Sequence, residues 1–203
     1  MSRLPSLALI PSLVIVAVLA TTASAATKPI RVTVVGDSVP ASIEYVPSAQ
    51  RLLREGLNVR LDLKVCRRLV QPSCTFAGKT PSTTLQAVQS YGRSLGQVLV
   101  VDVGYNESEH GYGAGIDRVL RAALAQGVNG VVWVTLREQR DIYKRTNVAI
   151  RSAARRWPQM QVADWHDYSA GKPWFRGDGL HMGNTGANAF AAFLRPYIFR
   201  AAS

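Results

Sequence analysis

The sequence predicts an α/β protein, a three-layer α/β/α sandwich around a mainly parallel five-stranded sheet of flavodoxin-like order. From residue 30 onward, short β-rich segments alternate with helical ones, the pattern that builds a parallel sheet through right-handed crossovers. Two segments, 98–103 and 131–136, are nearly continuous in apolar residues, which is typical of central strands covered on both faces. Neither a linker nor an internal repeat divides the chain, so we expect one domain over residues 26–203.

The first half of the chain contains the first two strands of this sheet. Residues 30–35 form a β-rich segment that ends at Gly36, and residues 41–55 form a helix that Gly56 stops. Residues 58–65 alternate apolar and polar side chains, which predicts a strand with one more exposed face, near an edge of the sheet.

The second half contains the last strand and most of the helices. The helix at 142–157 has apolar side chains at helical spacing and basic ones on its other side, and Pro158 ends it. The glycine-rich run Gly111-Tyr-Gly-Ala-Gly115 lacks the spacing of a dinucleotide-binding loop, so a flexible loop is expected there. The remaining elements are expected at 82–94, 116–126 and 187–200 for helices and at 161–165 for the fifth strand.

The first 25 residues have the features of an export signal. Arg3 gives a positive start, residues 7–20 are almost wholly apolar, and Ala23-Ser24-Ala25 has the small-x-small pattern that signal peptidase reads. The apolar run is too short, and too broken by Pro11, for a comfortable membrane span, which needs about 20 residues. We therefore expect a cleaved signal peptide at 1–25 and a secreted domain without a stable membrane span. An uncleaved N-terminal anchor is the alternative.

Basic residues dominate the charge of the chain. It has 24 Lys and Arg against 13 Asp and Glu, a formal net charge of +11. This excess favours anionic surroundings by long-range attraction, and for an exported protein these are cell-envelope polymers, lipid headgroups or acidic glycans. No pattern of a nucleic-acid-binding domain accompanies the charge, so nucleic acid is not an expected partner. A solvated surface explains such an excess equally well.

Cys66 and Cys74 are the two cysteines of the chain. In an oxidising compartment, two cysteines this close in sequence predict one disulfide, which closes a small loop around Gln71-Pro72-Ser73. With two cysteines and three histidines, a structural zinc site is not expected. No metal or organic cofactor is predicted.

Polar residues follow each predicted strand, at the edge where the sites of parallel α/β sheets lie. We therefore expect a hydroxyl, an amide, a carboxylate and an imidazole to meet at that edge. The segments that follow the five strands are, in order, Asp37-Ser38, Cys66-Arg67, Tyr105-Asn106, Arg137-Glu138 and the later loop that contains Asp178-Gly-Leu-His181.

Ser38, Asp178 and His181 are the candidate catalytic residues. Ser38 follows a strand and precedes a helix, where its hydroxyl is exposed, although a helix-capping serine is the plainer interpretation. Asp178 and His181 are three residues apart, which lets the carboxylate fix the imidazole tautomer so that the other ring nitrogen accepts a proton. His110 is a further histidine, and His166 is a rival base, because strand alternation would place it on one face with Asp164.

Asn106 is the candidate side-chain donor to an oxyanion. An amide after a buried strand can stabilise the negative charge that develops on a carbonyl oxygen. A turn asparagine and a glycosylation sequon, Asn106-Glu-Ser108, are the other interpretations of this residue. Arg137 could bind an anion or be solvated. The aromatic residues Trp165, Trp174 and Phe175 could wall a pocket or pack in the core.

Three blocks together resemble the SGNH hydrolase superfamily, also called GDSL esterases and lipases. They are Gly36-Asp-Ser38, Gly104-Tyr-Asn106 and Asp178-Gly-Leu-His181, in that family's order. Val39 and Glu107 depart from the usual motifs, and the family's block-two glycine, a backbone oxyanion donor, has no clean match. By position Cys66 takes its place, with Gly78 as the alternative. The resemblance covers residues 30–200.

The resemblance implies two-step acyl transfer through Ser38, with His181 as base, Asp178 as its partner, and the N–H groups of Ser38 and Cys66 with the Asn106 amide as oxyanion donors. We expect a secreted, monomeric ester hydrolase for short-acyl or O-acetyl esters of envelope carbohydrate or lipid. An acyltransferase that uses a sugar hydroxyl as acceptor is one alternative. A non-catalytic binding module for anionic wall polymer is the other.

Overall fold

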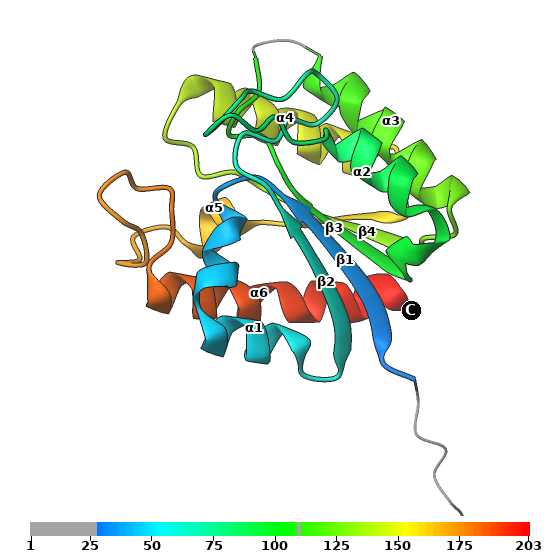
Figure 1. The fold of residues 1–203 in the computed structure, drawn as a ribbon, viewed down its shortest axis with the longest axis horizontal. Coiled ribbons are helices and arrows are strands. Elements are labelled where there is room, and N and C mark those ends of the chain that lie inside the picture. The colour runs from blue at the N-terminus through cyan, green and yellow to red at the C-terminus, as the bar shows by residue number, and fades with distance from the viewer. Residues whose placement is uncertain (1–27, 109–110) are drawn as a thin grey trace, which may run out of the picture.

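The computed structural model describes residues 28–108 and 111–203. The expected signal peptide at 1–25 and His110 lie outside these residues. Within the described part, helices cover both faces of a central sheet (Figure 1).

The sheet has five parallel strands in the order β2-β1-β3-β4-β5. This confirms the expected fold class, and β2 lies at an edge, as its alternating pattern predicts. The strands are β1 (Ile30–Gly36), β2 (Leu57–Leu63), β3 (Val98–Asp102), β4 (Gly130–Val134) and β5 (Met160–Ala163).

Two helical layers sandwich the sheet, and each packs on its own set of strand side chains. On one face, Val34, Val100 and Val132 are buried with Phe190 and Leu194. Because strand side chains alternate between faces, their neighbours Val35, Val101 and Trp133 point to the other layer. The first layer holds the 3₁₀ helix η1 (Pro40–Tyr45), α1 (Pro47–Arg54) and α6 (Asn184–Ala202), and the second holds α2 (Thr84–Tyr91), η2 (Gly92–Leu95), α3 (Tyr112–Ala125) and α4 (Asp141–Ala154).

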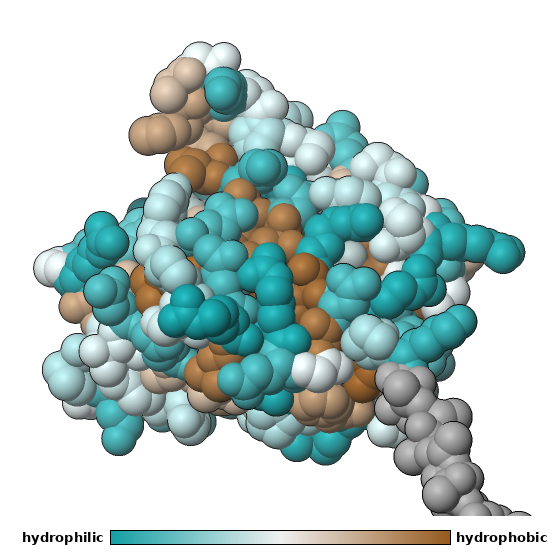
Figure 2. Space-filling model, turned by 60° about the horizontal axis from the view of Figure 1, so that its bottom comes forward, coloured by the Kyte–Doolittle hydropathy of each residue, from teal (hydrophilic) through white to brown (hydrophobic). Residues whose placement is uncertain are grey.

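The side of the molecule formed by α1 and α6 is shown in Figure 2. Hydrophilic residues dominate this surface, and hydrophobic ones gather in the seams between them. Among the described residues, no helix combines the length and apolar character needed to cross a bilayer.

The expected helix at 41–55 and the fifth strand at 161–165 differ from the structure. Pro47 starts a new helix, so the segment divides into η1 and α1. The strand ends at Ala163, because the Asp164 carboxylate accepts the backbone N–H of Asp167 and caps the short helix α5 (Trp165–Tyr168).

The prediction of a flexible loop at Gly111–Gly115 was wrong. Gly111, at φ 88°, is the residue before α3, and the helix begins at Tyr112. Gly115 is buried against the loop after β2, where a Cβ would lie 2.9 Å from Cδ2 of Leu69. Glycine is therefore needed there for close packing.

Candidate active site

The carboxyl ends of β1, β2 and β3 are tied together by backbone hydrogen bonds just beyond the strands. The N–H of Asp37 donates to the carbonyl of Asp102 at 3.1 Å, and the N–H of Lys64 donates to the carbonyl of Gly36 at 3.0 Å. A Cβ at Gly36 would lie 2.4 Å from Cγ of Pro40, so glycine permits the tight turn into η1. This turn places Ser38 at the sheet edge.

Ser38, His181 and Asp178 form one hydrogen-bonded chain. Nε2 of His181 lies 3.1 Å from Oγ of Ser38, and Nδ1 of His181 lies 2.6 Å from Oδ2 of Asp178. The structure therefore brings together the three predicted catalytic residues. Ser38 comes from the start of the domain, and Asp178 and His181 come from its end. In Figure 1 the orange segment that contains Asp178 and His181 lies beside η1.

Asp178 is held in an ionised state suited to orient the ring. Burial raises the pKa of Asp178, but the N–H of Leu180, the His181 ring and the His181 N–H outweigh it, so the pKa lies below its usual value of 3.8. Oδ1 accepts the two N–H groups at 2.8 and 2.9 Å, which leaves Oδ2 for the imidazole. A carboxylate in this position favours the tautomer with the proton on Nδ1, so Nε2 is free to accept the serine proton.

The loop that contains Asp178 is clamped at both ends. The N–H of Arg176 donates to the carbonyl of His181, and the carbonyl of Arg176 accepts the N–H of Gly179, each at 2.8 Å. The Met182 N–H donates to Oγ of Ser42 at 3.2 Å, which fixes the loop to η1. These bonds hold His181 at a set distance from Ser38.

A shallow pocket of about 190 Å³ opens over the three residues. Its volume suits an acyl group of a few atoms better than a long chain. It is lined by Ser38, Ser42, Tyr45, Arg176, Asp178 and His181.

Asp37 links two segments of the site, a contact that the sequence alone does not predict. It is fully buried, Oδ1 accepts the N–H of Val39 at 3.0 Å, and Oδ2 accepts those of Gly104 and Tyr105 at 3.1 Å each. Burial raises the pKa of Asp37 to about 6, against the opposing effect of these bonds. The carboxylate thus joins the Ser38 turn to the segment that carries Asn106. Its place inside the Gly-Asp-Ser block was the available signal.

Asp102 is a second buried carboxyl beside Asp37. Its Oδ1 has no hydrogen-bond partner among the described residues. Burial and the charge of Asp37 raise the pKa of Asp102 well above 3.8. Folding therefore favours the protonated form, and an acid of this kind costs stability increasingly as the pH rises above its unfolded pKa of about 4.

We expect Asp102→Asn to be more stable than the parent protein at neutral pH. The free energy of unfolding gained should grow with pH from about pH 4 upward, by at most about 1.4 kcal/mol per pH unit. Chemical denaturation at pH 4 to 7 measures this slope, with the exposed Asp141→Asn as control. A stability difference that does not change with pH would contradict this assignment.

The predicted oxyanion donors lie in adjacent segments. Nδ2 of Asn106 donates to the carbonyl of Arg67 at 3.3 Å, and Nε of Arg68 donates to the carbonyl of Asn106 at 2.6 Å. Cys66 has φ 72° in a turn closed by the Arg67 N–H on the Lys64 carbonyl. This is a backbone conformation that favours glycine, which fits the place of the missing block-two glycine.

Gly78, the alternative backbone donor, lies at the exposed tip of a hairpin in which Phe76 pairs with Lys79. Nothing lies within 4 Å of a Cβ built there. Its position therefore supports Cys66 over Gly78. Cys66 is joined to Cys74 by a disulfide, as expected from the sequence.

His166 does not share a strand face with Asp164, because it lies in α5. Its Nδ1 accepts the N–H of Glu138 at 3.3 Å, and its Nε2 lies 3.8 Å from Oε2 of the same residue. The Asp164 carboxylate is engaged elsewhere, with Arg151 at 2.6 Å and Thr135 at 2.9 Å. His166 is therefore held away from the Ser38 hydroxyl.

We expect His166→Ala to retain most ester-hydrolysing activity, within about threefold of the parent kcat/KM, whereas His181→Ala should lose at least about 1,000-fold. Steady-state kinetics on p-nitrophenyl acetate with both variants gives the comparison. Equal losses in the two variants would count against His181 as the sole base.

Arg137 and the aromatic residues Trp165, Trp174 and Phe175 are engaged in contacts within the protein. Arg137 donates to the carbonyl of Ser169 at 3.2 Å and lies 3.7 Å from the ring centre of Phe175. Trp165 is buried and stacks on Trp174 at 5.7 Å. The four side chains therefore contact other parts of the protein, and none of them lines the pocket over Ser38.

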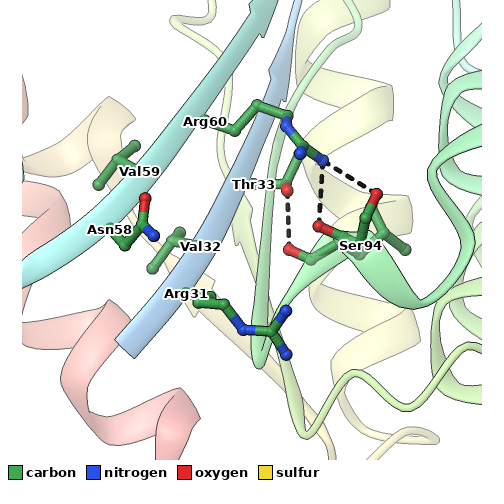
Figure 3. A pocket seen from close by; sticks show the side chains of 8 residues that line it. Arg31, Val32, Thr33, Asn58, Val59, Arg60 and Ser94 are labelled. Atoms are coloured by element: carbon green, nitrogen blue, oxygen red, sulfur yellow. Dashed lines mark hydrogen bonds between the residues drawn. The ribbon is translucent and has the colours of Figure 1, made fainter. Parts of the chain in front are cut away.

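A second pocket lies at the opposite, amino end of β1 (Figure 3). Arg60 donates there to the carbonyl and the hydroxyl of Ser94, and Thr33 donates to the carbonyl of Leu95. Arg31 also lines this pocket. Its lining contains neither histidine nor carboxylate, so it lacks the groups for the chemistry described above.

Known proteins share this architecture. The C-terminal catalytic domain of the Streptococcus pneumoniae peptidoglycan O-acetyltransferase OatA, solved with a methylsulfonyl adduct, superposes with a TM-score of 0.64 at 20% identity, over 85% of this chain and 95% of that chain. A carbohydrate acetylesterase family member from Sinorhizobium meliloti gives 0.64 at 13% identity, over 85% and 99%. The chain has the SGNH hydrolase fold.

Sequence comparison finds a relative that has the same name as the first of these structures. The chain is 31% identical over 157 residues to the O-acetyltransferase OatA of Staphylococcus aureus, across 76% of this chain and 23% of that protein. It therefore corresponds to about a quarter of the length of this relative. No protein-family model matches the chain.

Proposed function

We propose that this protein is a serine-dependent acyl-transfer enzyme that cleaves short-acyl esters. The observation that carries the proposal is the chain of hydrogen bonds from Ser38 through His181 to Asp178, at 3.1 and 2.6 Å. A hydroxyl, an imidazole and a carboxylate at these distances form the arrangement that activates a serine nucleophile.

The mechanism follows from these contacts. Nε2 of His181 takes the proton from Ser38 as Oγ attacks the ester carbonyl. The oxyanion is stabilised by the N–H groups of Ser38 and Cys66 and by the Asn106 amide. The carbon–oxygen bond to the alcohol breaks, the alcohol leaves with the proton from His181, and an acyl-Ser38 ester remains. Water, deprotonated by His181, then attacks the acyl carbon, the bond from that carbon to Oγ breaks, Ser38 takes the proton from His181, and the acid is released.

We propose O-acetyl esters of envelope carbohydrate as the substrate class. The pocket of about 190 Å³ supports a small acyl group. The similar proteins named above include a carbohydrate acetylesterase family member and a peptidoglycan O-acetyltransferase. The Cys66–Cys74 disulfide supports action outside the cytoplasm, where disulfides persist.

The acyl preference is tested with p-nitrophenyl esters of increasing chain length and with acetylated glycans. We expect kcat/KM to be highest for acetate and to fall with chain length, and acetate to be released from the glycans. An optimum at eight or more carbons would overturn the short-acyl assignment.

Acetyl transfer to a sugar is the second candidate, and the similarity to OatA favours it. The same acyl-Ser38 intermediate serves both reactions, because a sugar hydroxyl replaces water in the second step. Mass spectrometry of the products, with an acetyl donor and an oligosaccharide acceptor present, separates them. Acetylated oligosaccharide in excess of free acetate indicates a transferase, and free acetate alone indicates a hydrolase.

A further inference from the structure

The pocket over Ser38 contains a cation that the proposed mechanism does not use. Arg176 lines it together with Ser38 and His181, and its side chain is exposed. Among the described residues, its guanidinium has no hydrogen-bond or ion-pair partner, although its backbone is fixed on both sides to the 176–181 loop. A guanidinium with unpaired N–H donors on a fixed backbone is suited to bind a ligand that enters the pocket.

Three other arginines near this edge of the sheet are engaged in hydrogen bonds or ion pairs. Arg67 is buried in an ion pair with Asp62 at 3.0 Å. Arg68 is bound to the carbonyl of Asn106, and Arg137 to that of Ser169. These three arginines support loops, and Arg176 differs from them by facing the pocket with its donors free.

Arg176 does not neutralise the Asp178 carboxylate. That carboxylate has its oxygens satisfied by the His181 ring and by two backbone N–H groups, and no ion pair joins it to Arg176 within the described residues. The guanidinium is therefore available to a negative charge that comes with the substrate.

Tyr45 lines the same pocket from η1 and leaves 73% of its surface exposed. An exposed aromatic ring offers a flat apolar face with a polar tip, the kind of surface on which a ring-shaped ligand packs. A cation from one element and an aromatic ring from another thus flank the nucleophile.

We propose that Arg176 is a substrate-binding residue that selects esters of acidic sugars. The inference rests on the proposed function and names its substrate class more closely. The acyl group occupies the pocket at Ser38, and the alcohol part of the ester lies over its exposed rim, where the guanidinium binds a carboxylate or phosphate and Tyr45 packs against the sugar ring. Arginine is suited to this role because its planar guanidinium can donate two parallel hydrogen bonds to a carboxylate or to a phosphate.

The test compares two esters that differ in one charge, 3-acetoxybenzoate and its uncharged analogue 3-acetoxybenzamide. We expect the ratio of their kcat/KM values, benzoate over benzamide, to fall about tenfold in Arg176→Gln, the size typical of a lost charge-assisted hydrogen bond. Arg176→Lys should give an intermediate ratio, and high salt should lower the ratio of the parent protein. Phosphorylated and carboxylated acetyl sugars then separate the two sources of the anion.

Arg31→Gln is the matched control, since it removes the same charge at the amino end of β1 (Figure 3) and should leave the ratio unchanged. An unchanged ratio in Arg176→Gln and Arg176→Lys, with both esters still hydrolysed, would overturn this inference and leave the proposed function standing. Absence of turnover of any ester by the folded parent protein would instead remove the proposed function.

Discussion

Ser38→Ala is expected to lower kcat/KM for p-nitrophenyl acetate by at least about 1,000-fold. Without Oγ no acyl-enzyme forms, and His181 has no hydroxyl to deprotonate at 3.1 Å. The residual rate comes from ester binding and from the remaining oxyanion donors, which can assist direct attack by water. Initial rates with the purified variant provide the measurement.

The same variant should fold as the parent does. In the described part of the chain, the Ser38 hydroxyl bonds to His181 and to no other group, so its loss changes the free energy of unfolding by less than about 1 kcal/mol. Parent-like activity in a folded Ser38→Ala protein would rule out a Ser38 nucleophile.

Asp178→Asn is expected to lower kcat by about 10³- to 10⁴-fold, a size known from the serine-protease triad. An asparagine in this place can turn its NH₂ toward Nδ1 and favour the tautomer with the proton on Nε2, which cannot accept the Ser38 proton. Because the pKa of Asp178 lies below 3.8, the carboxylate of the parent is ionised at every pH above about 5, and the loss should be the same from pH 6 to 9.

Asp167→Asn is the matched control for this change. Its carboxylate is 75% exposed and lies 3.9 Å from His166, the rival base. We expect kcat to change less than twofold. A larger loss in Asp167→Asn than in Asp178→Asn would move the catalytic pair to His166 and Asp167.

Most of the fold could be predicted because hydrophobic periodicity is a local signal. The continuous apolar run at 98–103 and the alternation at 58–65 correctly indicated a central and an edge strand. The errors arose where tertiary contacts override local pattern. The glycines at 111–115 suggested a loop, yet Gly115 lies inside α3, where its lack of a side chain lets the helix pack closely against Leu69.

The site was predictable to the extent that it depends on strand ends. Polar residues that follow parallel strands converge at one edge of the sheet, and this rule predicted the proximity of Ser38 and His181, which are 143 positions apart in the sequence. Two features were not predictable in this way. The support role of Asp37 depends on three backbone N–H groups, two of them 67 and 68 positions away. The lack of a hydrogen-bond or ion-pair partner for the Arg176 guanidinium, among the described residues, depends on which acceptors lie near it in the folded chain.

Covalent labelling of the folded protein with a fluorophosphonate probe shows whether Ser38 is an activated nucleophile. Peptide mapping should find one probe per chain, on Ser38, with labelling lost in His181→Ala and retained in His166→Ala. An intact protein that stays unlabelled while it binds anionic wall polymer tightly would be a binding module. That outcome, or a label on another residue, would exclude Ser38 as the nucleophile.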